Sequence, residues 1–185
     1  MKMKIAIAPL TIDRYTEVVA LWRLCEGIGL SDADSRESIA AYLERNPGMS
    51  FIATIDGTLG GAVLCGHDAR RGYLHHLAVH PRFRNKGIGR QLVDLCLAAL
   101  RDAGIQKCHL FALNGNLDGI TFWESVGWTR RNEISVLSRN IGPGIDAPGA
   151  DLHAGKLFVE LDDAAVVVLL VATGPECLQD FHHAA

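Results

Sequence analysis

The sequence of 185 residues lacks the features that mark several large protein classes. Its longest apolar run, 164–172, is about half of the ~18–20 residues that a membrane span requires. Five cysteines form no C-x-x-C pair, and with no secretory signal apparent their odd number favours reduced thiols in a cytoplasmic protein. The formal net charge of −3 argues against a general nucleic-acid-binding protein, which is normally basic. No internal repeat indicates a solenoid or propeller.

What remains is the composition of an ordinary globular protein, with 49% apolar and 21% charged residues. The length fits one domain with a sizeable core. After residue 140 the composition changes to a Gly/Pro-rich linker at 142–149, followed by apolar runs at 156–161 and 164–173 that predict a hairpin. We therefore expect a domain over residues 1–140 and an extension over 141–185 of unknown role.

Periodicity and turn residues predict a mixed α+β fold, with antiparallel hairpins early in the chain and one β-α-β crossover in the middle. Asp56-Gly57 is a hairpin turn signal. The predicted strands are 5–10, 50–55, 61–65, 73–79, 107–113, 128–132 and 135–140. The predicted helices are 13–25, 35–45, 88–103 and 116–126, with Thr11 or Asp13 capping the first and Asp34 or Ser35 the second.

The most informative stretch is 74–91, where an apolar strand stops at Pro81 and a basic loop with two glycines leads into a helix. Glycines let the backbone approach a ligand closely, and a helix start offers free N–H groups and partial positive charge. The loop is a candidate pyrophosphate site, and its alternative is a tight turn with solvated basic residues. The candidate residues are Arg84, Asn85, Lys86, Gly87, Ile88 and Gly89.

Two motifs carry a resemblance to a known family. The run L-A-V-H-P at 77–81, followed by R-x-x-G-x-G at 84–89, resembles motif A of the GNAT superfamily of acetyl-CoA-dependent N-acetyltransferases. The block 116–128 is similar to that family's Asn-x-x-Ala-x-x-x-Tyr-x-x-x-Gly-Phe segment. The resemblance covers residues 4–140. It implies a mostly antiparallel central sheet with a splayed strand pair and helices on both faces.

The resemblance also implies an activity, the transfer of acetyl from acetyl-CoA to an amine by direct attack in a ternary complex. The amine is a small molecule or a protein N-terminus, and domains of this family are often homodimers. One alternative is a non-catalytic acyl-CoA-binding or regulatory module. Another is an interaction protein whose apolar segment 156–173 recruits a partner or exchanges with a neighbouring subunit.

The implied cofactor contacts follow from the family's fold. Leu77, Ala78 and Val79 lie on the splayed strand, where backbone groups bond the pantetheine amides as an added strand would. Asn116 reaches the pantetheine or thioester end. Trp123 stands where family members often have a tyrosine proton donor, and it either hydrogen-bonds the sulfur or packs against the pantetheine arm.

Amine acylation needs a proton acceptor, and His75 is the candidate because imidazole titrates near neutral pH. Histidines occur on this strand in related arylalkylamine N-acetyltransferases. The alternative is a polar strand residue that only bonds a neighbour. Tyr73 is a weaker candidate, as a proton donor or substrate contact. Strict alternation places Tyr73, His75 and Leu77 on one face and His76 on the other.

That alternation also argues against a metal site formed by His75, His76 and His80, since the first two point apart. The acceptor side is expected to involve the loop 26–35. Its Asp32 and Asp34 either hold an ammonium group or cap the second helix, and capping preference favours the second interpretation.

Overall fold

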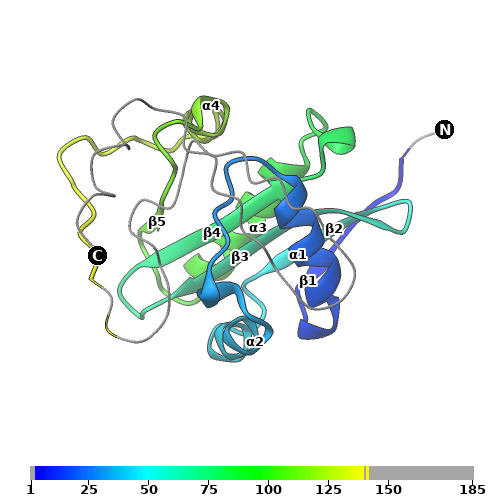
Figure 1. Ribbon diagram of the computed structural model, residues 1–185, viewed down its shortest axis with the longest axis horizontal. Helices are drawn as coiled ribbons and strands as arrows, with labels where there is room; N and C mark the ends of the chain where they lie inside the picture. Colours follow the sequence, from blue (N-terminus) through cyan, green and yellow to red (C-terminus); the bar gives the residue numbers. More distant parts are fainter. Residues whose placement is uncertain (1–2, 140, 142–185) are drawn as a thin grey trace, which may run out of the picture. The chain divides into compact units, whose positions relative to one another are not determined.

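The computed structural model describes residues 3–139 and 141, which form a five-stranded sheet flanked by helices (Figure 1). The strands lie in sequence order; the first four are antiparallel, and the last pair is parallel. The predicted mixed α+β class is confirmed. The strands are β1 (Ile5–Pro9), β2 (Phe51–Ile55), β3 (Thr58–His67), β4 (Gly72–Val79) and β5 (Cys108–Leu110). The helices are α1 (Tyr15–Leu24), α2 (Arg36–Arg45), α3 (Ile88–Asp102) and α4 (Leu117–Ser125), with 3-10 turns η1 (Ile12–Arg14), η2 (Asp32–Asp34) and η3 (Pro81–Phe83).

Local sequence signals set most element boundaries. Asp56 and Gly57 both have positive φ, 49° and 86°, as the two-residue hairpin between β2 and β3 requires. Ser35 caps α2 by accepting a hydrogen bond from the Ser38 N–H at 3.2 Å, which decides between the two predicted caps. Gly104, with φ of 78°, follows the C-terminal end of α3.

Helices cover both faces of the sheet and define two buried clusters. Helices α1 and α2 pack on one face, where Trp22 is fully buried, and α3 packs on the other (Figure 1). Trp22 is therefore part of the core. In α3 the buried side chains follow one another at spacings of four, one, three and four residues, which is the pattern of a helix with one apolar face. They are Ile88, Leu92, Val93, Cys96 and Leu100.

An irregularity in β4 creates the functional part of the sheet. Leu64 of β3 faces His75 and Ala62 faces Ala78, so one residue of β3 stands opposite two of β4. This is a β-bulge, and His76 in it has a positive φ of 50°. Pairing between β4 and β5 ends at Leu74 opposite Leu110, so the strands separate at the bulge. The predicted splayed strand pair is thereby confirmed.

The bulge also makes the prediction of strict alternation wrong. The His76 ring lies 4.9 Å from the Trp22 ring, and the His75 ring lies 6.1 Å from the Tyr42 ring. Both histidines therefore lie on the α1/α2 face, whereas Leu77 packs with the α3 cluster. The extra residue shifts the two-residue period by one position, so neighbours in the chain share a face.

The last two predicted strands, 128–132 and 135–140, are not strands within the described residues. Residues 128–139 are turns and irregular chain, and β5 is shorter than the predicted 107–113. The apolar side chains in the second half of this segment are exposed: Ile134, Val136 and Leu137, the last at 94%. Apolar alternation favours a strand only where a neighbouring strand supplies the hydrogen bonds, and the described part of this segment has no such partner.

Two further predictions concern the segment after residue 140 and whether the chain contains a membrane-spanning helix. The linker 142–149 and the hairpin 156–173 lie outside the described residues, so the division at residue 140 stays a prediction. Across residues 3–139 and 141, no helix is long and apolar enough to cross a membrane. The longest, α3, has 15 residues.

We expect Ser50→Ala to lower the free energy of unfolding by about 1–3 kcal/mol. The Ser50 hydroxyl is buried, accepts from the Cys65 N–H at 3.0 Å and donates to the Cys65 carbonyl at 3.2 Å. Alanine leaves both groups of β3 unpaired. Urea unfolding measures the change, with exposed Thr58→Ala as the control. Equal midpoints for the two variants would contradict this role of Ser50.

Candidate active site

A cleft of about 780 Å³ opens where β4 and β5 separate. Its walls come from four places: the end of α1 with the loop after it, the bulged half of β4, the start of α3, and α4 with the chain after β5. The predicted site residues among its lining are His75, Leu77, Ala78, Val79, Arg84, Asn85, Gly87, Ile88, Gly89, Asn116 and Trp123. Residues far apart in the sequence thus meet in one cavity.

The phosphate loop, residues 84–89, has the backbone that a bound anion needs. Asn85 and Gly87 have positive φ, 60° and 75°, and Gly87 is the N-cap of α3 with no side-chain cap bond. The first hydrogen bond of the helix runs from the Gln91 N–H to Gly87, so the N–H groups of residues 88–90 precede it. Gly89 is required for space, because a Cβ there would lie 3.3 Å from the Phe122 ring.

The basic side chains of this loop divide into two groups. Arg84 and Arg90 line the cleft, and Arg84 Nε donates to the Val79 carbonyl at 3.2 Å. That carbonyl also accepts from the Cys25 thiol at 3.6 Å. Lys86 is not among the lining residues, and its Nζ lies 3.3 Å from the sulfur of Met3. The two guanidinium groups, and not the Lys86 ammonium, are therefore the cations that line the cleft here.

Asn116 and Trp123 bring α4 to the cleft. Asn116 caps the helix through its Oδ1, which accepts from the Gly119 N–H at 2.9 Å. Its amide nitrogen lies against Gly27, where an added Cβ would be only 2.2 Å away. The Trp123 ring packs edge-on to Phe122 and Trp128. Both predicted residues line the site, and Asn116 also joins the α1–α2 loop to α4.

His75 lines the cleft, and its surroundings favour the neutral form of its imidazole. Burial lowers the pKa of His75, the neighbouring His76 lowers it further, and Asp34 acts in the opposite direction. An imidazole with a lowered pKa is unprotonated at neutral pH and can accept a proton. Tyr73 is outside the lining, and its hydroxyl lies 3.5 Å from Asp68 Oδ2. The structure thus brings His75, and not Tyr73, to the cavity.

Sequence reasoning missed the pair formed by His76 and Asp34. His76 Nε2 lies 2.6 Å from Asp34 Oδ1, and the other carboxylate oxygen accepts from the Ser31 N–H at 2.8 Å. Burial alone raises the pKa of Asp34, but the hydrogen bonds from His76 and Ser31 outweigh burial and lower it. Asp34 is therefore ionised and engaged. The prediction that it caps the second helix is wrong, because Ser35 caps α2 and Asp34 belongs to the capping box of η2.

A signal for this pair existed in the sequence, because a bulge was expected in the strand and a bulge breaks alternation. Within the part of the chain that the structure describes, no group of three or more His, Cys, Asp or Glu side chains is arranged to hold a metal ion. The two histidines and Asp34 lie together as a cluster of imidazole and carboxylate groups.

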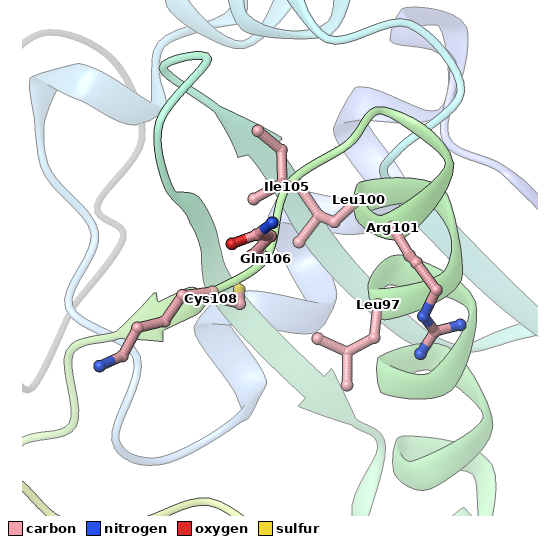
Figure 2. A pocket seen from close by; sticks show the side chains of 7 residues that line it. Leu97, Leu100, Arg101, Ile105, Gln106 and Cys108 are labelled. Atoms are coloured by element: carbon pink, nitrogen blue, oxygen red, sulfur yellow. The ribbon is translucent and has the colours of Figure 1, made fainter.

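A smaller hollow of about 150 Å³ lies at the opposite end of α3 from the phosphate loop. Figure 2 shows Leu97, Leu100 and Arg101 of α3 facing the chain that leads into β5. Burial raises the pKa of Cys108 in this hollow to about 12, so its thiol stays protonated at neutral pH. The hollow offers no cluster of reactive groups, and the larger cleft is the candidate active site.

Comparison with known proteins shows the class of protein to which a chain with this cleft belongs. An acetyltransferase of Pectobacterium atrosepticum is 30% identical over 129 residues, which are 70% of this chain and 91% of that protein. PaiA N-acetyltransferase of Thermoplasma acidophilum, solved in complex with coenzyme A, matches with a TM-score of 0.61 at 22% identity, covering 68% of this chain and 90% of that one. Ribosomal-protein-S18-alanine N-acetyltransferase of Escherichia coli matches with a TM-score of 0.57 at 20% identity, covering 67% and 77% of the two chains.

The family model described as the acetyltransferase (GNAT) family matches residues 15–128. The chain belongs to this family and is an acetyl-CoA-dependent N-acetyltransferase. The cleft fits the cosubstrate, because two arginines, two positive-φ residues and the free N–H groups at the start of α3 meet at one end.

We expect Gly87→Glu to weaken coenzyme A binding at least tenfold, as measured by calorimetry. The carboxylate would stand at the start of α3, where it repels a pyrophosphate. Gly57→Glu is the matched control. Gly57 also has a positive φ, and neither glycine has an atom closer than 3.9 Å to an added Cβ. Both variants lose similar stability, so equal coenzyme A affinities would remove residues 84–89 from the site.

Proposed function

We propose that the protein acetylates a primary amine, on a small molecule or a protein N-terminus, by direct attack in a ternary complex. The observation that carries the proposal is the single cleft that joins the phosphate loop, the free edge of β4 and two imidazoles. A covalent enzyme intermediate needs an activated nucleophile. Cys25, the cysteine that lines the cleft, has a pKa raised mainly by burial.

Each group that lies along β4 has its own task in the proposed reaction. The phosphate loop and the backbone of Leu77 to Val79 bind the two ends of the pantetheine-pyrophosphate chain of acetyl-CoA. The thioester then lies near the bulge, where His75 takes a proton from the bound amine. Holding the amine against the thioester supplies much of the rate, because positioning alone is worth several kcal/mol.

The acceptor side of the cleft carries negative charge. Glu26, Gly27 and Ile28 follow α1 and line the cavity, and Glu26 is exposed. Since Asp34 is already engaged with His76, Glu26 is the carboxylate of this loop that we assign to the acceptor ammonium. We also propose a cytoplasmic location, which the free thiols of Cys25, Cys65, Cys96 and Cys108 support.

Purified protein should release coenzyme A thiol from acetyl-CoA when supplied with a panel of primary amines and amino-terminal peptides. Acetylated product is identified by mass spectrometry. Glu26→Gln should raise KM for the best amine and leave coenzyme A affinity unchanged, with Glu124→Gln on exposed α4 as the control. Tight coenzyme A binding without turnover on any amine would contradict the proposal.

His75→Gln should lower kcat by about 10²-fold or more, the usual contribution of a general base, with coenzyme A affinity unchanged. The neutral imidazole is the active form, so native kcat/KM falls as pH drops through the pKa of His75. Because burial lowers that pKa, the fall lies below about pH 6.5, the ordinary value for histidine. Rates between about pH 4.5 and 8 test this, and an acid limb that survives in His75→Gln would exclude His75.

A further inference from the structure

The proposed transfer requires a proton donor as well as an acceptor. When the N–C bond forms and the C–S bond breaks, a thiolate leaves. Trp123 faces the cleft where related enzymes often have a tyrosine, and indole N–H is not a usable acid. Tyr42, against the His75 ring, is also unsuitable, because burial raises its pKa far above neutrality.

We propose that His76, oriented by Asp34, protonates the leaving thiolate, while His75 accepts the proton of the amine. This inference rests on the proposed acetyl transfer. His76 is the catalytic residue and Asp34 its positioning residue.

The geometry of the pair determines which ring nitrogen transfers the proton. A carboxylate only accepts hydrogen bonds, so the His76 Nε2 that lies 2.6 Å from Asp34 carries a hydrogen. Nδ1 is then the nitrogen left for transfer. Packing restricts the ring, since it lies 4.9 Å from the fully buried Trp22. Imidazolium at His76 is compensated by the adjacent carboxylate, whose residue is only 9% exposed.

The order of residues along β4 separates the two tasks. Moving back from the phosphate loop, the free strand edge passes Val79 and Leu77 and reaches His76 before His75. A pantetheine arm that follows this edge therefore brings its sulfur to His76 first. The acetyl group and the amine lie beyond the sulfur, toward His75. The bulge makes this possible, because it places both rings on the same face.

The surroundings of the two rings suit opposite roles. His75 has Tyr42 of α2 beside it, and its pKa is lowered by burial and by His76, so it is neutral and has a nitrogen lone pair available to accept a proton. His76 has Asp34 of η2 as a direct partner, and the Tyr15 hydroxyl of α1 donates to the Asp34 carbonyl at 2.9 Å. The other ionisable groups that face this part of the cleft from α1 and the loop after it are Cys25 and Glu26.

The protons balance in this scheme. The acceptor ammonium gives one proton to His75, and its nitrogen lone pair forms the N–C bond. As the C–S bond breaks, its electron pair goes to sulfur, which takes the Nδ1 proton of His76. The amide nitrogen loses its surplus proton to the vacated His76, and His75 releases its proton to solvent. The products are the amide, coenzyme A thiol and one proton.

The test is the variant His76→Asn with two acyl donors. Asparagine tolerates the positive φ of position 76, and its amide still donates to Asp34, but it transfers no proton. With acetyl-CoA we expect kcat to fall about 10²-fold. With acetyl-selenocoenzyme A the selenolate leaves without protonation, so the variant should approach the native rate. His75→Asn should lose the same factor with both donors, and His67→Asn, outside the cleft, should lose nothing.

Asp34 is tested by a readout that needs no turnover. Nitrogen NMR of labelled histidine in the native enzyme should show a His76 Nε2 proton in a strong hydrogen bond, lost in Asp34→Asn. That variant should also lose activity with the thioester more than with the selenoester.

Equal losses of His76→Asn with both donors would overturn the acid role and leave His76 as a structural contact. Native enzyme that turns over no amine with either donor would instead overturn the proposed transfer, and this inference with it.

Discussion

The bulge at His76 is the constraint on which the site depends. One extra residue in β4 ends its pairing with β5 after Leu74 and leaves the edge at Leu77 to Val79 without a partner strand. In a regular sheet this edge would bond its neighbour, and the cleft would be closed. The same residue shifts the side-chain period, so that two adjacent histidines lie on one face. A single backbone irregularity thus separates the two strands and brings both imidazoles to one face.

The Asp34–His76 pair links the bulge in β4 to the connection between α1 and α2. Asp34 ends η2 and bonds the Ser31 N–H, so the α1–α2 connection is tied to the bulge. A second tie lies between Gly27 and Asn116, which joins the same connection to α4. Removing either partner would leave the other, which is largely buried, without this hydrogen bond. The pair therefore helps to set the shape of the cleft.

Prediction from the sequence succeeded where neighbours in the chain decide the structure. The Asp56–Gly57 hairpin, the amphipathic face of α3 and the block at 116–128 all depend on residues within a turn or two of each other. It failed where distant contacts decide. The prediction that side chains alternate strictly along β4 did not take the bulge into account. The strands predicted after residue 127 would need a neighbouring strand, which the described chain does not supply.

The sequence by itself determined the geometry of the loop 84–89, because positive φ at Gly87 and the start of α3 arise from adjacent residues. The resemblance at 77–89 and 116–128 was enough to indicate the cosubstrate. Only the tertiary structure decided which ionisable side chains meet in the cleft. Asp34 and His76 are 42 positions apart and meet because α1 and α2 pack over the bulged strand. Which side chains become acid or base depends on burial and on charged neighbours, and these exist only once the chain is folded.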